Sequence, residues 1–445
     1  MNDSFDPCSY GAVADGHTKD TAAVQAAIDA AAAQGGTVRL AGGTFVCGTL
    51  YLKSNVALEI TNSATLLASP DIADYGTDTH HNRYHNELEL DRCFLFAQDA
   101  ENVTICGSGV IDGNAAAFPN AGGIYRPMLL RVLRCRNVRV QNLRLLNAAA
   151  WTTAFLDSDF IWATDLHIEN HRNYNGDGLD FDGCRHVWVR SCHIDGTDDN
   201  LCLQSSGLPV QDVHISDCAF TSVCAGIRIG LKSIGEISGV VISNCTMRNI
   251  WREGIKLECT EGGSITDILV ENVTMHNVRR PIFAILNNRY RPDDLGSSIE
   301  LDHIPPIGTM ARLRFVGITA VDDEEMAHAQ RRFDNDIMGE PRFGGCRLDA
   351  NAAHPIEDVT IRDFWYTAIG GVRLADLPAA PYPEVPDRLQ APTAPGSENY
   401  YPNWSRTTHL DARYVRGLTL ENLHFITLHS DERPKMLTEG PTVML

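Results

Sequence analysis

The chain has 445 residues, and its 57 acidic side chains outnumber its 37 basic ones, for a formal net charge of -20. A charge of this sign and size repels nucleic acid and anionic membrane surfaces at long range, so we expect neither as a partner. No apolar run reaches the ~18 residues of a transmembrane helix, so none is predicted.

Residues 1 to about 45 are predicted to form a lead-in segment and a cap. The alanine-rich stretch Asp20 to Gln34 is predicted to be a helix, because alanine is the best helix former and two glycines follow. Its Val24 and Ile28 stripe is expected to cover the open end of a solenoid, since terminal coils need a cap.

A seven-residue pattern with alternating apolar residues recurs along the chain. Its first six copies begin at Asn137, Phe160, His186, Asp212, Gly239 and Asp267. The starts step by 23, 26, 26, 27 and 28 residues, and later copies begin near Arg312, Asp358 and Gly417. Period-two alternation indicates strands, and this spacing is too short for a strand-helix-strand unit. The chain is therefore predicted to be all-β, a single-domain right-handed parallel β-helix over residues 1–445, with coils from about 46 to 434.

Cysteines occupy one position of this pattern, at Cys192, Cys218 and Cys245. We expect them to stack inside the coils, because no cysteine or histidine spacing of the zinc type occurs. Thirteen cysteines used as thiols would suit a reducing compartment. The first twenty residues lack the apolar core of a signal peptide, so we expect a cytoplasmic location unless a leader was removed.

A second family of strands lies between the first. These strands begin at Gly178, Asn200, Gly226 and Gly254, and each has apolar residues at its second and fourth places. If those apolar residues point inward, the residues between them point outward, because strand side chains alternate. The predicted outward column is Asp180, Cys202, Arg228 and Lys256, and the column just before the strands is Asp177, Asp199, Ala225 and Glu253.

Asp177, Asp198 and Asp199 are therefore predicted to converge on adjacent coils, roughly 4.8 Å apart. Like charges this close raise at least one pKa, so one proton is expected to be shared or retained. A retained proton beside an ionised carboxylate is what glycosidic cleavage requires. The structural alternative is that these residues cap turn backbone, as aspartate often does.

The motifs that carry these acids resemble those of the polygalacturonase-like glycoside hydrolases, family 28. Asn175-Gly-Asp-Gly-Leu-Asp180 resembles the family's Asn-Thr-Asp-Gly-Ile-Asp, and Thr197-Asp-Asp-Asn-Leu-Cys-Leu203 resembles Gly-Asp-Asp-Ala-Ile-Cys-Leu. Gly107 to Gly113 and Tyr10 to Gly16 are similar to further segments of pectin-active β-helices. The resemblance implies that Asp198 is the general acid, that Asp177 and Asp199 position and deprotonate water, and that the anomeric carbon is inverted.

Two departures from the family pattern concern the substrate. The family's Gly-His-Gly segment falls on Cys224-Ala225-Gly226, and its Arg-Ile-Lys motif falls on Lys256-Leu257-Glu258. The histidine is absent and one cation is reversed in sign, although Arg228 adds a cation one coil away. Glu258 is expected to accept hydrogen bonds from sugar hydroxyls, which favours a neutral or mixed glycan, and uronate remains an alternative.

Further substrate contacts are expected around the acids. Asn175 and Asp180 belong to the first motif, and His171, Arg172 and Tyr174 lie just before Asp177. Trp151, one coil earlier, either stacks on a sugar ring or packs in a loop. The run from His80 to His85 resembles a metal or sugar loop, but it has no carboxylate pattern, and we expect neither a metal nor a cofactor.

We therefore predict an inverting glycoside hydrolase that acts on an oligo- or polysaccharide of plant type. Long insertions at 287–310, 322–355 and 374–409 are expected to wall the groove, which favours exo action. A polysaccharide lyase on the same fold and a silent glycan-binding solenoid are the alternatives. The sequence leaves the sugar, the linkage and the oligomeric state open.

Overall fold

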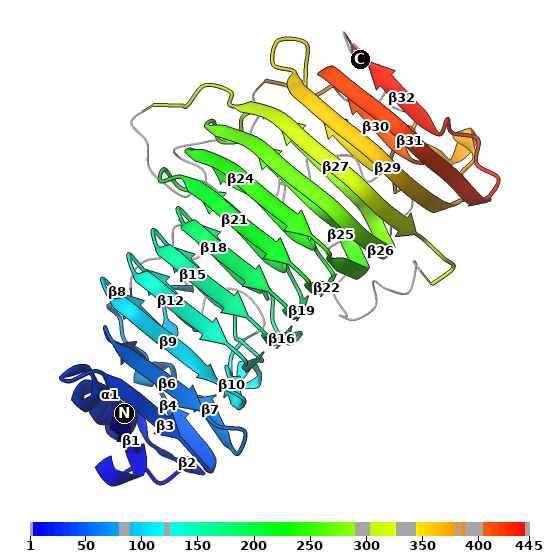
Figure 1. Cartoon of the computed structure of the whole chain (residues 1–445). Coiled ribbons are helices and arrows are strands. Elements are labelled where there is room, and N and C mark those ends of the chain that lie inside the picture. Colours follow the sequence, from blue (N-terminus) through cyan, green and yellow to red (C-terminus); the bar gives the residue numbers. More distant parts are fainter. Residues whose placement is uncertain are drawn as a thin grey trace. The chain divides into compact units, whose positions relative to one another are not determined.

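The computed structural model describes residues 3–79, 90–119, 125–289, 303–325, 344–379, 384–387 and 404–440. They form two compact units: unit 1 comprises residues 1–201 and 210–218, and unit 2 comprises residues 202–209 and 219–445. Each unit is a stack of parallel coils, as Figure 1 shows for the strands of either unit. The predicted all-β parallel β-helix is confirmed, and connections between parallel strands of this kind are right-handed. The single domain over 1–445 stays a prediction.

Three parallel sheets build unit 1, and most of its coils contribute one strand to each sheet. The first sheet holds β1 (Asp3–Phe5), β3 (Gly36–Leu40), β6 (Val56–Ile60), β9 (Glu101–Gly107), β12 (Arg136–Gln141), β15 (Asp159–Thr164), β18 (Arg185–Arg190) and β21 (Val210–Ser216). The second holds β2 (Asp15–Lys19), β4 (Gly43–Cys47), β7 (Ala64–Ala68), β10 (Val110–Asp112), β13 (Arg144–Leu146), β16 (His167–Asn170) and β19 (His193–Gly196). The third holds β5 (Leu50–Leu52), β8 (Cys93–Gln98), β11 (Met128–Leu133), β14 (Thr153–Leu156) and β17 (Leu179–Asp182).

Unit 2 has the same kind of parallel strands, with fewer breaks between them. Its shorter strands are β20 (Leu201–Ser205), β22 (Ala219–Ser222), β23 (Ile227–Ser233), β24 (Glu236–Ser243), β28 (Cys346–Asp349), β30 (Leu410–Arg413) and β32 (Met436–Glu439). Its longer strands are β25 (Thr246–Cys259), β26 (Ser264–Leu286), β27 (Thr309–Val321), β29 (Ile356–Gly370) and β31 (Val415–His429). The longer strands turn a corner of the coil without a break, so one strand pairs with neighbours on two faces.

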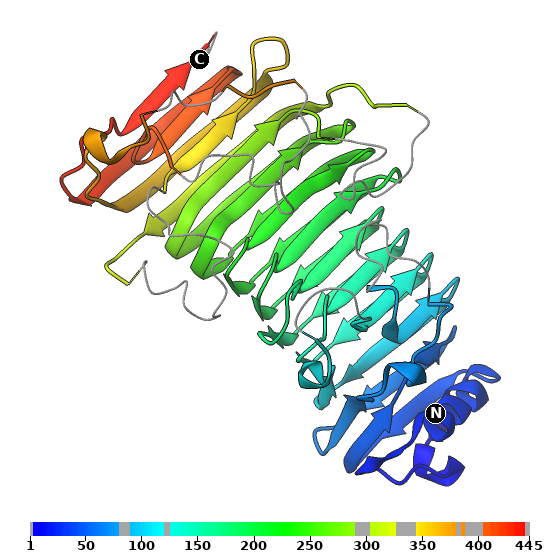
Figure 2. The same cartoon turned by 180° about the vertical axis from the view of Figure 1, so that it is seen from behind.

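The predicted helix caps the first coil of unit 1. Helix α1 spans Thr21–Ala32, two residues short of the predicted end, and Val24 and Ile28 are fully buried. It lies at the N-terminal end of unit 1 in Figure 2, beside the earliest strands. Asp20 precedes the helix, but its carboxylate accepts hydrogen bonds from the backbone N–H groups of Val13 and Ala14 instead of capping it. Short 3-10 helices occupy Pro7–Tyr10, Ile72–Asp74, Ala115–Ala117 and Leu374–Asp376. Within the described residues, no helix has the length and apolarity needed to cross a membrane.

The first residue of each repeat has a left-handed backbone conformation. That residue has a positive φ, between 51° and 72°, in every copy found in the sequence, at Asn137, Phe160, His186, Asp212, Gly239, Asp267, Arg312, Asp358 and Gly417. Most of these residues are Asn, Asp or Gly, which adopt the left-handed conformation at the lowest cost. Each repeat therefore has a left-handed residue within its strand, at the start of the seven-residue pattern.

The interior of the coils is apolar, as the alternation predicts. Leu179 and Phe181 are fully buried, and the ring of Phe181 stacks on that of Phe155 with centroids 5.0 Å apart. The predicted cysteine positions Cys192, Cys218 and Cys245 are also buried, so this prediction is confirmed.

Candidate functional site

The acids Asp177, Asp198 and Asp199 lie on neighbouring coils of unit 1. The N–H of Gly178 donates to the carbonyl oxygen of Asp199 (3.2 Å), which joins the two coils directly behind the acids. A carboxylate oxygen of Asp177 lies within 4.8 Å of one of Asp199, and the same holds for Asp198 and Asp199. The predicted convergence of the three aspartates is therefore present in the structure.

The three acids differ in their exposure to solvent. Asp177 is 2% exposed and Asp199 is fully buried, whereas Asp198 is half-buried. The Asp198 carboxylate accepts a hydrogen bond from the N–H of Asp199 (2.9 Å), which fixes its rotamer beside its neighbour. Asp198 is thus the member of the cluster most open to an incoming molecule. Oxygens spaced this closely suit a shared proton, a shared water molecule or a shared cation.

Asn175 forms the turn that leads to Asp177. Its φ of 54° lies in the left-handed region, which asparagine tolerates. Arg126, only 1% exposed, holds this turn: its guanidinium donates to the carbonyl oxygen of Tyr174 and to Oδ1 of Asn175, both at 2.7 Å. The contact of Arg126 with this turn could not be predicted from the sequence, because Arg126 lies 49 residues before Asn175 and outside every motif. Asn175 therefore has a structural role in addition to the predicted substrate contact.

Asp180 occupies the predicted outward position on β17. It pairs in register with Ala154 of β14, between the inward side chains of Leu179 and Phe181. Although it points away from the coil interior, Asp180 is 3% exposed. Other parts of the chain therefore cover this outward column, a feature that strand alternation cannot predict.

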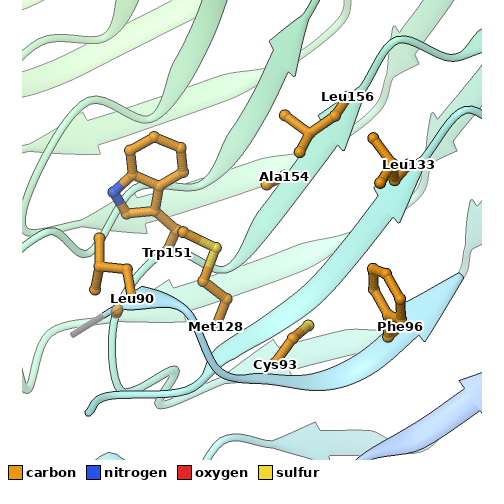
Figure 3. Packing of buried hydrophobic residues seen from close by; sticks show 9 residues of the cluster. Leu90, Cys93, Phe96, Met128, Leu133, Trp151, Ala154 and Leu156 are labelled. Carbon is orange, nitrogen blue, oxygen red and sulfur yellow. The ribbon is translucent and has the colours of Figure 1, made fainter. Parts of the chain in front are cut away.

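Trp151 belongs to an apolar cluster on the third sheet of unit 1. The cluster, shown in Figure 3, contains Leu90, Cys93, Phe96, Met128, Leu133, Ala150, Trp151, Ala154 and Leu156. In this view the Trp151 ring lies beside Leu90 and Met128, and its side chain is 7% exposed. Of the two alternatives for Trp151, the packing role agrees with this environment.

The residues just before Asp177 have three different environments. His171 Nε2 lies 2.9 Å from Oδ1 of Asp195 on the next coil, whereas Arg172 is exposed. Tyr174 is half-buried, and burial raises the pKa of its phenol. His171 therefore contributes to the contact between the loop before Asp177 and strand β19 of the next coil, and Arg172 and Tyr174 remain predicted substrate contacts.

Unit 2 carries its own group of buried charged residues. Arg228 of β23 and Lys256 of β25 are register partners and are 7% and 1% exposed. Lys256 Nζ lies 3.2 Å from Glu258 Oε2 and 3.9 Å from Glu253 Oε2. The predicted column of Arg228 and Lys256 is present within unit 2, and Glu258 neutralises part of the charge of Lys256.

Three further arginines, which sequence reasoning did not single out as site residues, surround Glu253. Arg280 lies 3.0 Å from its Oε1 and Arg252 3.5 Å from its Oε2, and Arg279 is also buried. Burial alone would raise the pKa of Glu253, but Arg252, Lys256 and Arg280 outweigh burial and hold this pKa below its usual value. Burial and the neighbouring Arg280 lower the pKa of Arg279 to about 9. The spacing of one coil from Glu253 to Arg280 could have identified this pair from the sequence.

The segment with the missing histidine lies at the start of β23. Cys224 and Ala225 are buried, and the N–H of Gly226 donates to the carbonyl oxygen of Glu253 (2.9 Å). The family's histidine position is therefore filled by small buried side chains. The predicted metal or sugar loop from His80 to His85 lies outside the described residues.

Comparison with known proteins identifies relatives of this chain. Residues 42–298, more than half of the chain, match the family described as Glycosyl hydrolases family 28. A probable polygalacturonase of Vitis vinifera is 27% identical over 262 residues, which cover 52% of each chain. An exo-poly-alpha-D-galacturonosidase of Dickeya chrysanthemi is 25% identical over 243 residues, 43% of this chain and 40% of the relative. The matches thus span about half the length of these curated relatives or less.

A solved structure supports the fold over nearly the whole chain. A hyperthermoactive exopolygalacturonase from Thermotoga maritima superposes with a TM-score of 0.69 at 18% identity, covering 96% of this chain and 92% of the other. At this identity the match establishes the fold and not the activity.

Proposed function

Because the chain belongs to family 28 of the glycosyl hydrolases, we propose that it hydrolyses a glycosidic bond in a pectic or related plant-type oligo- or polysaccharide. The observation that carries this proposal is the carboxylate cluster, in which oxygens of Asp177 and Asp198 each lie within 4.8 Å of an oxygen of Asp199. Two acceptors at this separation can both hydrogen-bond one water molecule. Asp198, the third acid, can then donate a proton to the leaving group.

In the proposed mechanism, the half-buried Asp198 donates its proton to the glycosidic oxygen as the bond to the anomeric carbon breaks. Asp177 and Asp199 hold a water molecule and accept its proton while the water oxygen bonds to the anomeric carbon from the opposite face. The product is inverted, because attack and departure occur on opposite faces of the sugar. Clustering of the three carboxylates favours retention of one proton, since like charges oppose full ionisation.

The charged group in unit 2 suggests how an acidic sugar would be recognised. Arg228 and Lys256 would attract a uronate carboxylate, and Glu258 would accept hydrogen bonds from sugar hydroxyls. The short separation of Lys256 and Glu258 reduces the local positive charge. We therefore propose that the substrate is a mixed glycan that contains uronate and neutral sugars, in preference to pure polygalacturonate. Arg172 and Tyr174 are proposed as additional contacts.

Exo action is proposed on two grounds. The sequence carries long insertions of the kind that wall a groove, and the Dickeya relative is described as an exo-poly-alpha-D-galacturonosidase. Much of these insertions lies outside the described residues. Size analysis of early products tests this proposal: release of one small product supports exo action, and a ladder of intermediate fragments contradicts it.

The proposed hydrolysis is tested by a screen of pectic, rhamnogalacturonan and neutral plant oligosaccharides, with products identified by mass. Hydrolysis adds the mass of one water molecule for each bond cut, whereas a lyase gives an unsaturated product that absorbs ultraviolet light. An unsaturated product would favour elimination, and binding without turnover would favour a glycan-binding protein.

The cytoplasmic location is also kept as a proposal. All thirteen cysteines lie in the described part of the chain; none forms a disulfide bond, and most are buried. Buried thiols outside disulfides suit a reducing compartment, which supports this location. Fractionation of the source cells with an antibody against the protein would test it.

A further inference from the structure

One hydroxyl group joins the two loops that carry the acids of unit 1. Thr197 Oγ1 accepts a hydrogen bond from the N–H of Gly176 (3.0 Å) and donates one to the carbonyl oxygen of Asn173 (2.6 Å). Thr197 directly precedes Asp198, and Gly176 directly precedes Asp177. A single side chain therefore ties the residue before one acid to the residue before the other.

The same hydroxyl occupies the space beside Gly176. A Cβ atom added at Gly176 would lie 2.1 Å from Thr197 Oγ1 and 2.9 Å from the carbonyl oxygen of Asn170. The φ of Gly176 lies outside the left-handed region, so the position needs glycine for space and not for backbone conformation. The identity of residue 176 is thus coupled to that of residue 197.

The two family motifs show the reverse arrangement of these residue types. In the motifs quoted above that this chain resembles, threonine stands where this chain has Gly176, and glycine stands where it has Thr197. The small residue and the hydroxyl-bearing residue have exchanged loops in this chain. An exchange of this kind keeps one hydroxyl between the loops without the steric clash that two side chains would create.

We propose that Thr197 is a positioning residue: its hydroxyl fixes the Asp177 loop against the Asp198 loop, and Gly176 is its steric counterpart. The role in catalysis rests on the proposed hydrolysis. Thr197 would act through the two acids, because the turn from Asn173 to Gly176 sets the direction in which Asp177 leaves the loop. A small displacement of a catalytic group is enough to reduce turnover strongly.

The remaining contacts of the loops indicate that the fold would survive loss of this hydroxyl. Behind the acids, the N–H of Thr152 donates to the carbonyl oxygen of Asp177 (2.9 Å) and that of Gly178 to Asp199. Arg126 holds the start of the turn at Tyr174 and Asn175. These contacts keep the coils paired, so loss of the hydroxyl should affect acid geometry more than stability.

The kinetic test compares Thr197→Ala with Thr197→Ser. For Thr197→Ala we expect kcat to fall roughly 10- to 100-fold, since misplacement by about 1 Å can cost that much, while KM stays within about twofold. Thr197→Ser keeps the hydroxyl and should retain kcat within about threefold. Thr164→Ala, which alters a half-buried threonine at the end of β15, is the matched control and should leave kcat unchanged. Wild-type kcat in Thr197→Ala, or equal loss in both Thr197 variants, would overturn the positioning role.

A second measurement tests the pairing without any substrate. Gly176→Ala is made in the wild type and in Thr197→Ala, and the Tm of all four proteins is measured, which forms a double-mutant cycle. We expect Gly176→Ala to lower the Tm by several degrees in the wild type and by less than half as much when the hydroxyl is absent. Equal losses in the two backgrounds would overturn the steric coupling.

The two measurements also separate this inference from the proposed function. A wild-type protein that hydrolyses no glycan would contradict the hydrolysis and the catalytic role of Thr197 together. The Tm cycle would still decide whether Gly176 and Thr197 are coupled. An active wild type with an unaffected Thr197→Ala variant would contradict the inference alone.

Discussion

Two groups of buried acids, one in each unit, are held in opposite ways. In unit 1, an oxygen of Asp177 lies within 4.8 Å of one of Asp199, so acid is placed beside acid. In unit 2, Glu253 lies 3.0 Å from Arg280 and Glu258 lies 3.2 Å from Lys256, so acid is placed beside cation. Clustered acids oppose full ionisation, whereas paired acids are held ionised. Unit 1 is therefore suited to hold a transferable proton, and unit 2 to present fixed charge.

The two groups of buried acids should also contribute differently to the stability of the fold. Removing one partner of a buried ion pair leaves the other charge without compensation and destabilises the fold. Removing one acid from a cluster of like charges relieves repulsion. Substitutions in the acid cluster of unit 1 should therefore affect activity more than stability, and substitutions that break the ion pairs of Glu253 or Glu258 in unit 2 should lower stability.

The largest expected effect is on turnover by Asp198→Asn. The amide cannot donate the proton that the leaving oxygen requires, so we expect kcat to fall by about 10³-fold, within the range for general acid catalysis. The Tm should stay close to that of the wild type, because the charge removed lies among like charges. Asp165→Asn, at an exposed turn with a φ of 54°, is the control and should remain fully active. Full activity of Asp198→Asn would contradict the assignment of the general acid.

The second effect is on stability, through Glu253→Gln. This change leaves the buried side chains of Arg252, Lys256 and Arg280 without their shared carboxylate, and we expect a loss of about 3 kcal/mol of unfolding free energy. Chemical denaturation measures it, with the exposed Glu271→Gln on β26 as the control. The pKa of Glu253 is lowered in the folded protein, so its contribution is present above the unfolded pKa and is lost as pH falls through the folded value. A variant as stable as the wild type at neutral pH would show that the surrounding cations do not depend on Glu253.

The third effect depends on pH and concerns Asp322, a buried acid in unit 2 that accepts a hydrogen bond from the hydroxyl of Tyr366 (3.2 Å). Burial raises the pKa of Asp322 from 3.8 to about 8. The folded protein then binds a proton that the unfolded chain has released, so stability falls as pH rises from about 4 to about 8. Asp322→Asn should be more stable than the wild type by about 2 kcal/mol at a pH above the folded pKa.

Denaturation at several pH values tests the sign of this effect. The advantage of Asp322→Asn should shrink toward zero as the pH approaches the unfolded pKa, because the wild-type carboxyl is then neutral in both states. A constant difference at all pH values would show that the substitution acts through packing and not through the proton.

The smallest effect is on substrate preference, through Glu258→Gln. Loss of this carboxylate removes a negative charge that lies 3.2 Å from Lys256. We expect kcat/KM for uronate-rich substrates to rise relative to neutral ones by roughly fivefold, equivalent to about 1 kcal/mol. Competition between labelled uronate-rich and neutral oligosaccharides measures the ratio. An unchanged ratio would indicate that Lys256 and Glu258 do not contact the distinguishing sugar.

Much of the fold could be predicted from the sequence, because its cause is periodic. The alternating residues fix which side chains point inward, as Leu179 and Phe181 show, and the constant spacing fixes which coils are neighbours. The continuous course of β26 around a corner was not predictable, because the seven-residue pattern that begins at Asp267 ends at Val273 and does not show whether the strand ends there too. The burial of Asp180 and Lys256 was also missed, because strand alternation gives direction but not coverage by other segments.

The candidate site was predictable only where its residues belong to local motifs. Asp177 and Asp199 could be placed side by side because their separation is close to one coil. Arg126 could not, because it contacts Asn175 across a long stretch of sequence with no repeated spacing. The contact between Gly176 and Thr197 appeared in the sequence only as two departures from the family motifs, and its steric cause required coordinates.

The most direct test of the central claim, hydrolysis by the acid cluster of unit 1, is a time course of product formation followed by proton NMR on the best substrate from the glycan screen. The account predicts that the wild type releases a saturated sugar whose first-formed anomer is inverted, and that Asp198→Asn releases it about 10³-fold more slowly. A product of retained configuration, an unsaturated product, or equal rates for the two proteins would contradict it.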